Sequence, residues 1–319
     1  MRALVTGGAG FIGSHLVDAL LARGDRVAVL DDLSTGSADN LSGALAAGAT
    51  LAEASVTDPE AVAASFADHS PEIVFHLAAQ MDVRVSIERP VFDLDVNVGG
   101  TINLLEEARK DPQTRIVFAS TGGAIYGEGA GRELPVAESS QRRPDAPYGQ
   151  SKLSAEGYLS LYSRLYGVEA TSLRLGNVYG PRQDPHGEAG VVAIFCGALL
   201  GGTRPRVFGD GGQTRDYIYV DDVVAAFLAA AAAPAGGPYN IGTGVETSVL
   251  ELGGLIAAAC GTDFEPEFAP ARTGEVERIA IDPSRAASEL GWRAECALAD
   301  GLAATVESFR GGRAQRSRS

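Results

Sequence analysis

The stretch Thr6-Gly7-Gly8-Ala9-Gly10-Phe11-Ile12-Gly13 joins a short aliphatic run, residues 2–5, to a long amphipathic segment. A strand, a glycine-rich turn and a helix in this order form the first unit of a dinucleotide-binding fold. The glycines permit positive φ, let the backbone approach a pyrophosphate, and let the helix pack close to the strand. N–H groups at the helix N-terminus then face the phosphate charge. The stretch predicts a dinucleotide site; a turn that serves packing alone is the simpler alternative.

Asp31 ends the next predicted strand, residues 26–30, at the expected distance from the glycine turn. A carboxylate there accepts hydrogen bonds from the ribose hydroxyls of NAD but repels the 2′-phosphate of NADP. No arginine follows within Asp32-Leu33-Ser34-Thr35-Gly36. The sequence therefore predicts NAD, with a turn or helix-capping carboxylate as the alternative role for Asp31.

Short β-branched runs alternate with longer Ala- and Leu-rich segments along the first half of the chain, which is typical of βαβ units. Parallel neighbouring strands need helical crossovers, so an α/β fold with a doubly wound parallel (Rossmann) sheet follows. The predicted strands are 2–5, 26–30, 50–52, 73–76, 115–119 and 170–175, and the predicted helices are 11–23, 59–68, 91–108 and 147–166.

The pattern changes after residue 175, where Gly, Pro and charged residues become dense up to residue 217. Helices are predicted beyond this region at 220–232, 249–259, 283–289 and 298–309. We expect a Rossmann domain over 1–175, with 219–242 packing back on it. Residues 176–218 and 243–310 then form a smaller C-terminal α/β substrate-binding lobe, and 311–319 form a disordered tail.

Composition excludes several classes of protein. The chain has 319 residues, enough for about two lobes, and its net charge of −15 disfavours nucleic acid or anionic membranes as partners. A phosphorylated ligand then requires a local basic pocket. The three scattered cysteines, Cys196, Cys260 and Cys296, have no metal-type spacing, so no metal site is predicted and a reducing, cytoplasmic compartment is expected. No secretory signal or membrane span is predicted.

Tyr148 and Lys152 lie four residues apart at the start of a predicted helix, which places them on one helix face. Free tyrosine, with a pKa near 10, is a poor base at neutral pH. A nearby ammonium and a positive nicotinamide ring favour the phenolate, which can take and return a proton. A hydroxyl of Ser120 or Thr121, at the end of the strand 115–119, can assist. The alternatives are a solvated helix face and a turn hydroxyl.

These features together resemble the extended short-chain dehydrogenase/reductase superfamily, and within it the nucleotide-sugar epimerases of the NAD-dependent epimerase/dehydratase family. The resemblance covers nearly the whole chain. It includes the glycine turn, Asp31 and the Tyr148–Lys152 pair, and its further motifs are His76-Leu77-Ala78-Ala79-Gln80, Asn97-Val98-Gly99-Gly100-Thr101, Asn177-Val178-Tyr179-Gly180-Pro181-Arg182, Arg206-Val207-Phe208-Gly209-Asp210-Gly211 and Arg215-Asp216-Tyr217. It implies interconversion of UDP-glucose and UDP-galactose by inversion at C4, through a transient 4-keto sugar, in a homodimer that keeps NAD bound.

The resemblance also implies the site residues. The catalytic residues would be Thr121, Tyr148 and Lys152, with Thr121 chosen over Ser120 by counting from the strand; the pair Gly122-Gly123 leaves that register open by one. The NAD site would comprise Gly7, Gly10, Phe11, Ile12, Gly13, Asp31, Asp32, Ser34, Thr35, Gly36, Ser55, Val56, Leu77, Ala78, Ala79, Gln80, Asn97 and Ser120 with Tyr148 and Lys152. The substrate site would comprise Asn177, Val191, Val192, Phe195, Val207, Phe208, Arg215, Arg272 and Glu275 with Thr121 and Tyr148. Ser55 replaces the acidic residue that holds adenine in relatives, so we expect a looser adenine contact.

Four other functions stay open. A 4,6-dehydratase needs an acid–base pair after the catalytic threonine, and Gly122-Gly123 supplies none. A nucleotide-sugar reductase needs exchangeable NADPH, which Asp31 disfavours, and a non-catalytic NAD-sensing protein would not need Tyr148 and Lys152. Epimerisation of UDP-glucuronate, UDP-N-acetylglucosamine or TDP-glucose is also possible, although the bulk of Ile279 is expected to disfavour N-acetyl groups.

Overall fold

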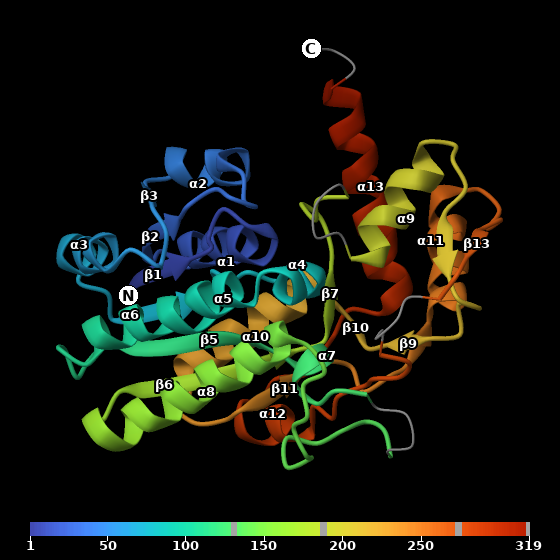
Figure 1. The fold of residues 1–319 in the computed structure, drawn as a ribbon. Coiled ribbons are helices and arrows are strands. Elements are labelled where there is room, and N and C mark those ends of the chain that lie inside the picture. Colours follow the sequence, from blue (N-terminus) through green and yellow to red (C-terminus); the bar gives the residue numbers. More distant parts are fainter. Residues whose placement is uncertain (129–132, 186–189, 272–275, 317–319) are drawn as a thin grey trace.

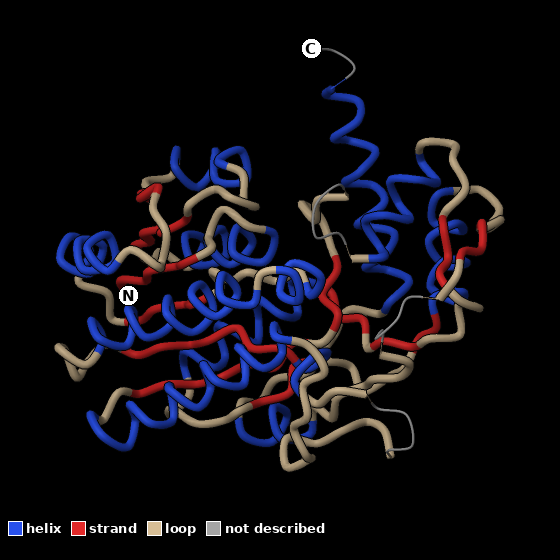
Figure 2. Tube along the Cα trace, viewed as in Figure 1, coloured by secondary structure: helices blue, strands red, loops and turns tan. Residues whose placement is uncertain are grey.

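The computed structural model describes residues 1–128, 133–185, 190–271 and 276–316, without side chains for 312–316. A seven-stranded sheet forms the centre of the first lobe, and every neighbouring pair in it is parallel (Figures 1 and 2). Its order is β11-β6-β5-β4-β1-β2-β3. The strands are β1 (Arg2–Thr6), β2 (Arg26–Asp31), β3 (Thr50–Glu53), β4 (Ile73–His76), β5 (Arg115–Thr121), β6 (Glu169–Leu175) and β11 (Tyr239–Ile241).

Helices cover both faces of this sheet because its strands alternate apolar side chains between two buried surfaces. Ala3 and Val5 of β1 belong to the cluster under α1 (Phe11–Ala22) and α10 (Val220–Ala232). Leu4 belongs to the cluster on the opposite face. The helices there are α3 (Pro59–His69), α6 (Gly100–Ala108) and α8 (Pro147–Tyr166). This is the predicted doubly wound α/β fold.

The strand order reverses between β1 and β4, since β2 and β3 continue on one side and β5, β6 and β11 on the other. In open α/β sheets, ligands bind beyond the carboxyl ends of the strands at such a reversal. The glycine turn follows β1 and the Leu77–Gln80 segment follows β4, so both lie at this position. The fold thus brings two predicted cofactor segments to one sheet edge.

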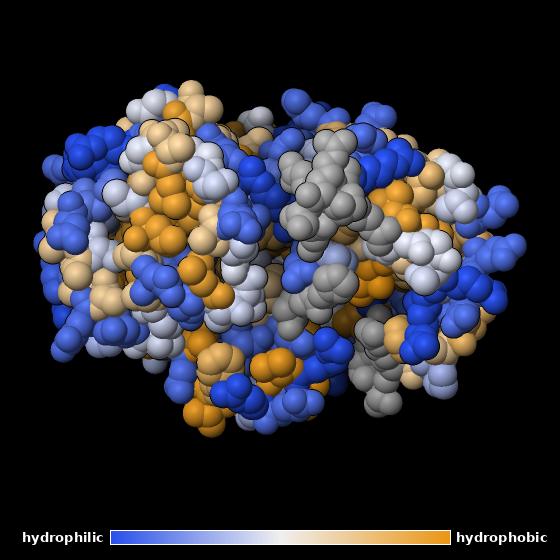
Figure 3. Space-filling model, turned by 90° about the horizontal axis from the view of Figure 1, so that it is seen from above, coloured by the Kyte–Doolittle hydropathy of each residue, from blue (hydrophilic) through white to orange (hydrophobic). Residues whose placement is uncertain are grey.

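The second lobe has its own core, formed by α9 (Val191–Leu200), α11 (Val249–Cys260) and α13 (Leu298–Arg316). Three two-stranded sheets accompany these helices. They are β7 (Asn177–Tyr179) with β10 (Tyr217–Tyr219), β8 (Arg206–Phe208) with β13 (Glu267–Ala269), and β9 (Thr214–Arg215) with β12 (Thr247–Ser248). Seen from above, the molecular surface is hollowed between the two lobes (Figure 3).

The chain passes between the lobes more often than the sequence suggests. After the first part of the second lobe, α10 and β11 join the first lobe, and β11 pairs with β6. Helix α12 (Ser284–Glu289) and Trp292 also pack in the core of the first lobe, although the sequence assigns 243–310 to the second. Hydrophobic periodicity does not reveal which of two cores an apolar face will join.

Two helix predictions differ from the structure. The predicted helix 91–108 is helical throughout but contains a π-helical turn (Asp95–Gly99) between α5 (Pro90–Leu94) and α6, and α4 (Val83–Glu88) precedes Pro90. The proline ring and its missing N–H end α4 at this point. Helix α13 continues to Arg316, into the predicted tail, and Arg310 donates hydrogen bonds to the carbonyls of Ala259 and Cys260.

The remaining short helices are the 3₁₀ turn Ala38–Leu41, α2 (Ser42–Ala46) and α7 (Gly122–Ile125). Within the described ranges, no helix is both long and apolar enough to span a membrane.

Candidate functional site

The glycine turn has the close backbone contacts that its sequence predicts. Gly7 has a φ of +70°, and a Cβ atom there would lie 2.6 Å from the backbone nitrogen of Ala78. A Cβ atom on Gly13 would lie 2.1 Å from the carbonyl oxygen of Gly7. Gly10 precedes the first turn of α1, and no side chain caps that helix N-terminus. The first N–H groups of a helix have no intrahelical acceptor, so this turn fits the pyrophosphate of a dinucleotide.

Asp31 is buried and fixes the shape of the turn. Its Oδ2 accepts a hydrogen bond of 2.8 Å from the N–H of Ala9, and its Oδ1 accepts one of 2.9 Å from the N–H of Leu33. Burial raises the pKa of Asp31, and these two N–H groups oppose the increase. Asn40, which the sequence analysis did not identify, donates to the carbonyl of Ala9. Each Asp31 oxygen retains a lone pair, so the carboxylate fits the ribose hydroxyls of NAD.

Gln80 and Asn97 build the segment after β4. Asn97 donates to the carbonyl of Gln80 at 2.8 Å and accepts from its N–H at 3.1 Å. The Gln80 side chain accepts from the N–H of Asp82 and donates to Asp93. Both side chains therefore hold the backbone of Leu77–Gln80 against the glycine turn, and their predicted contact with NAD remains a prediction.

His76, at the end of β4, is buried in a complete chain of hydrogen bonds. Thr101 Oγ1 donates to the carbonyl of Asn97, so it accepts from Nε2 of His76 at 3.0 Å. Nδ1 of His76 then accepts from Thr6 Oγ1 at 2.8 Å. Burial, aided by the charge of Lys152, lowers the pKa of His76 to about 3. The ring is therefore neutral, and both of its nitrogens are used in structural hydrogen bonds.

Lys152 lies beside the carboxyl end of β5. Its side chain is buried, Nζ donates to the carbonyl of Ala119 at 2.9 Å, and the ammonium lies 4.7 Å from the centre of the Phe118 ring. Burial lowers the pKa of Lys152 to about 7, while Asp93 and Glu156 raise it. Tyr148 is one helical turn earlier on α8 and is partly exposed.

Ser120 and Thr121 have different surroundings at the end of β5. Ser120 Oγ donates a 2.6 Å hydrogen bond to Glu156, so its proton is not available for a hydrogen bond to a ligand. Thr121 caps α7, because its Oγ1 accepts from the N–H of Ala124 at 3.2 Å. A hydroxyl that accepts from a backbone N–H can still donate its own proton to a ligand. This difference supports Thr121 as the assisting hydroxyl.

Glu156 belongs to a buried ion pair that the sequence analysis missed. Its two carboxylate oxygens accept hydrogen bonds of 2.9 and 2.6 Å from Nε and Nη2 of Arg174, which is fully buried. Arg174 also donates to the hydroxyl of Tyr126, which donates to Asn240. The pair is satisfied on both sides, which is the condition for a buried salt bridge to be tolerated. Its sequence signal is only a carboxylate four residues after Lys152.

Gly122 and Gly123 begin α7, directly after Thr121. A Cβ atom on Gly122 would lie 2.6 Å from Cδ1 of Ile281, whereas one on Gly123 would make an ordinary 3.5 Å contact with Asn177. An acidic side chain at position 122, such as a dehydratase would need there, would therefore require the Ile281 side chain to move, whereas position 123 has room for one.

The predicted substrate residues fall into three groups. Asn177, Val191, Phe208 and Arg215 are partly exposed. Val192, Phe195 and Val207 are buried in the core of the second lobe, and this packing accounts for them without a ligand. Arg272 and Glu275 lie outside the described residues.

Ile279 is buried with Ile125, Tyr126 and Val136. The side chain of Ile279 therefore packs in this core. The prediction that its bulk excludes N-acetyl groups from the substrate site is left without support.

The remaining predicted cofactor residues lie in the expected segments. Asp32 accepts from the N–H and the hydroxyl of Ser34, and a Cβ on Gly36 would lie 2.9 Å from the carbonyl carbon of Ala9. Ser55, after β3, accepts hydrogen bonds from the N–H and the hydroxyl of Thr57, and its looser contact with adenine stays a prediction. Within the described residues, no cluster of three or more His, Cys, Asp or Glu side chains could hold a metal ion.

A Rossmann sheet with a glycine-rich turn after β1, a carboxylate at the end of β2 and a Tyr–Lys helix pair is typical of dinucleotide-dependent enzymes that oxidise and reduce a carbon–oxygen bond. Residues 3–242 match the NAD dependent epimerase/dehydratase family. The chain belongs to that family.

Three relatives are similar over almost the entire chain. A UDP-glucose 4-epimerase from Mycolicibacterium smegmatis is 49% identical over 97% of this chain and 99% of its own. The crystal structure of a UDP-glucose 4-epimerase from Thermotoga maritima with UDP-glucose has a TM-score of 0.94 at 46% identity, covering 98% of this chain and 100% of that one. A Thermus thermophilus UDP-glucose 4-epimerase complex with NAD has a TM-score of 0.91 at 46% identity, covering 98% and 99%.

Proposed function

We propose that this chain interconverts UDP-glucose and UDP-galactose by inverting C4 through a transient 4-keto sugar, with NAD as its coenzyme. The observation that carries the proposal is the buried Lys152 ammonium, one helical turn after Tyr148 on α8, at the end of β5 where Thr121 lies. The similarity to UDP-glucose 4-epimerases at 46% to 49% identity, along nearly the whole chain, supports this substrate and reaction.

Three side chains divide the proton chemistry. Tyr148 takes the proton of the C4 hydroxyl and later returns it. Thr121 donates a hydrogen bond to the same oxygen, and the positive charge of Lys152 stabilises the phenolate of Tyr148. NAD, when bound, supplies the acceptor and the donor of the C4 hydride. Because the proton returns to its origin, a single phenol serves both directions.

Inversion requires that the sugar present both of its faces to the same site. We infer that the second lobe grips the uridine diphosphate, through Asn177, Phe208 and Arg215 among the described residues, and leaves the hexose loosely held. Guanidinium groups suit such a grip because they bind phosphate oxygens in pairs. A firm diphosphate grip with a free hexose ring permits the keto sugar to turn over between the two hydride transfers.

The distinguishing experiment is NMR-followed incubation of the purified chain with UDP-glucose, UDP-N-acetylglucosamine, UDP-glucuronate and TDP-glucose, without added cofactor. UDP-galactose formation from UDP-glucose is expected. A 4-keto-6-deoxy product would indicate a dehydratase instead, and unreduced bound NAD without conversion of any sugar would indicate a sensing protein. Preferential turnover of another sugar would replace the proposed substrate but keep the reaction.

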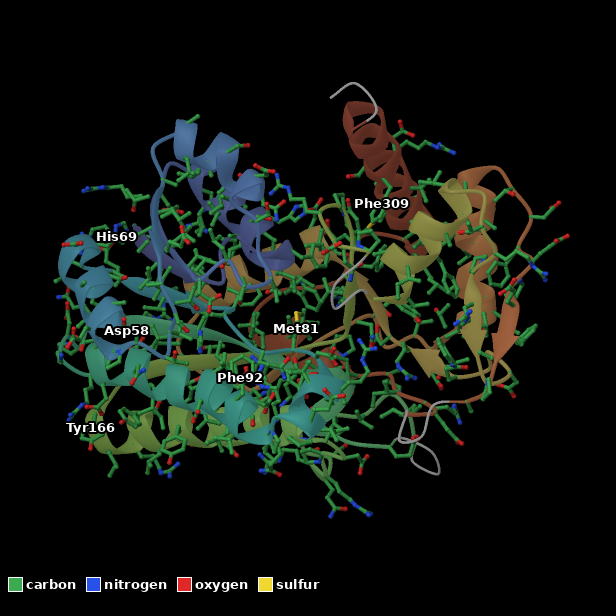
Figure 4. All side chains as sticks on the ribbon, turned by 45° about the horizontal axis from the view of Figure 1, so that its top comes forward. Asp58, His69, Met81, Phe92, Tyr166 and Phe309 are labelled. Carbon is green, nitrogen blue, oxygen red and sulfur yellow. The ribbon has the colours of Figure 1, made fainter. Side chains whose placement is uncertain are left out.

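We further propose a homodimer and a cytoplasmic location. Exposed apolar side chains gather on α4 and α5, where Ile87 and Val91 are 62% and 70% exposed. Figure 4 shows Phe92 of α5 and Tyr166 of α8 on one side of the molecule. An apolar surface of this kind is typical of an interface between copies of a chain. The three free cysteines favour a reducing compartment.

A further inference from the structure

One fully buried carboxylate, Asp93 of α5, joins the two halves of the candidate site. Its Oδ2 accepts a hydrogen bond of 2.6 Å from Oγ of Ser151, the residue before Lys152 on α8. Its Oδ1 accepts hydrogen bonds of 2.9 Å from Nε2 of Gln80 and 3.0 Å from Nδ2 of Asn97. Asp93 therefore connects the catalytic helix to the segment that lies against the glycine turn.

These three hydrogen-bond partners are uncharged, so they satisfy the oxygens of Asp93 without neutralising it. A buried anion of this kind needs a positive group nearby. Lys152 is the adjacent buried cation. Of the two carboxylates that raise the pKa of Lys152, Asp93 has the larger effect. The other carboxylate, Glu156, is already paired in bidentate fashion with Arg174.

The other groups around Lys152 do not supply the negative charge that stabilises its ammonium, which leaves Asp93 for this role. On β4, His76 is neutral within its hydrogen-bond chain. On β5, the carbonyl of Ala119 and the ring of Phe118 carry no formal charge. On α8 itself, Tyr148 is the remaining titratable neighbour. The carboxylate that lacks a guanidinium partner is that of Asp93.

We propose that Asp93 is a positioning residue with two effects: it keeps Lys152 protonated, and it ties the coenzyme segment to the catalytic helix. The effect on turnover rests on the proposed function. The effects on the charge of Lys152 and on coenzyme retention do not, so they can be tested even if the substrate differs.

The composition of the chain makes the charge directly measurable, because Lys110 and Lys152 are its two lysines. Incorporation of ¹³Cε-lysine then gives two NMR signals, and Lys110→Arg, at an exposed position, assigns them. In Asp93→Asn, the titration midpoint of Lys152 should move to lower pH by about one unit or more, since a nearby opposite charge shifts a pKa by about 1–3 units. The alkaline limb of the kcat profile should move in the same direction.

Two further variants separate charge from linkage. Ser151→Ala removes the hydrogen bond to Asp93 but retains the carboxylate, so the Lys152 midpoint should stay near the wild-type value while less NAD remains bound after gel filtration. Asp95→Asn removes an exposed carboxylate two residues away and should change neither property. If Asp93→Asn does not fold, Asp93→Glu should restore the fold with a near-wild-type Lys152 midpoint.

An unchanged Lys152 midpoint in folded Asp93→Asn, or a large shift in Ser151→Ala, would overturn the electrostatic role. Full retention of NAD in both variants would overturn the linking role. Failure of the proposed function has a separate signature: no UDP-sugar is converted, while the NMR titration and the NAD content still distinguish the variants.

Discussion

Individual residues of the site combine burial with charge, and this combination sets their chemistry. A buried ammonium is expensive because desolvation disfavours the charged form. Burial lowers the pKa of Lys152, and the nearby carboxylates of Asp93 and Glu156 offset only part of this decrease, so the pKa lies at about 7. The charge of Lys152 is therefore sensitive to small changes in its surroundings, which suits the proposed role of stabilising a phenolate at neutral pH.

Replacing the phenol tests the proton chemistry most directly. Tyr148→Phe should retain bound NAD, because the rest of the cofactor site is unchanged, yet lose about 10²–10⁴-fold in kcat. Turnover of UDP-glucose and the NAD absorbance released on denaturation are the two measurements. Retained turnover would remove Tyr148 from the mechanism.

The neutral ring of His76 should make the fold sensitive to acid. Its folded pKa of about 3 lies below the unfolded value near 6.5, so the unfolded state binds more protons between these pH values. The contribution of His76 to the free energy of unfolding is fully present well above pH 6.5 and decreases as the pH falls, by about 1.6 kcal/mol between pH 6.5 and pH 5. Urea unfolding at these two pH values measures the difference. In His76→Gln the decrease should be smaller, and an equal decrease would contradict this account.

At the scale of elements, helix α8 contains two glycines with opposite roles. A Cβ atom on Gly149 would lie 2.6 Å from the carbonyl oxygen of Ala124, so the close approach of α8 to α7 requires a glycine. A Cβ atom on Gly157 would meet no atom within 4 Å. The contact at Gly149 positions Tyr148, the preceding residue, relative to Thr121.

Alanine at each position provides a matched pair. Gly157→Ala should stabilise the fold by about 0.5–1 kcal/mol, since it improves helix propensity without a clash. Gly149→Ala should destabilise it by about 1–3 kcal/mol, as overpacking does, and should lower kcat by moving Tyr148. Thermal unfolding and UDP-glucose turnover of both variants are the measurements. Equal stabilities would contradict the close contact.

Elements with a strong local signal could be predicted from the sequence. The strand Ile73–His76 and the helices Pro147–Tyr166 and Val220–Ala232 have the predicted bounds. Helix α9 is not predicted from the sequence, because the Gly- and Pro-rich region before it gives no signal for where a helix begins. The glycine turn, Asp31, Tyr148 and Lys152 could be proposed as site residues from the sequence because each obeys a fixed spacing. Asp93 and Arg174 follow no spacing: Asp93 and Ser151 are 58 residues apart, and only the tertiary fold brings them together.

At the scale of the whole molecule, the apolar surface on α4 and α5 predicts self-association. Val91→Glu places a charge at its most exposed position, and burying an unpaired charge in an interface is costly. Light scattering after gel filtration should show a dimer for the wild type and a monomer for Val91→Glu. The matched change Val245→Glu, at a residue of 60% exposure in the second lobe, should leave the dimer intact. A wild-type monomer would contradict the proposal.

The repeated passage of the chain between the lobes has a mechanical consequence. Segments from both parts of the second lobe are continuous with β6, α10, β11 and α12 of the first. Several covalent tethers, rather than a single flexible joint, restrain any swivelling of one half against the other. The two lobes therefore keep their relative orientation while a ligand is bound between them. The rotation that exposes the opposite face of the sugar is then made by the ligand and not by the protein.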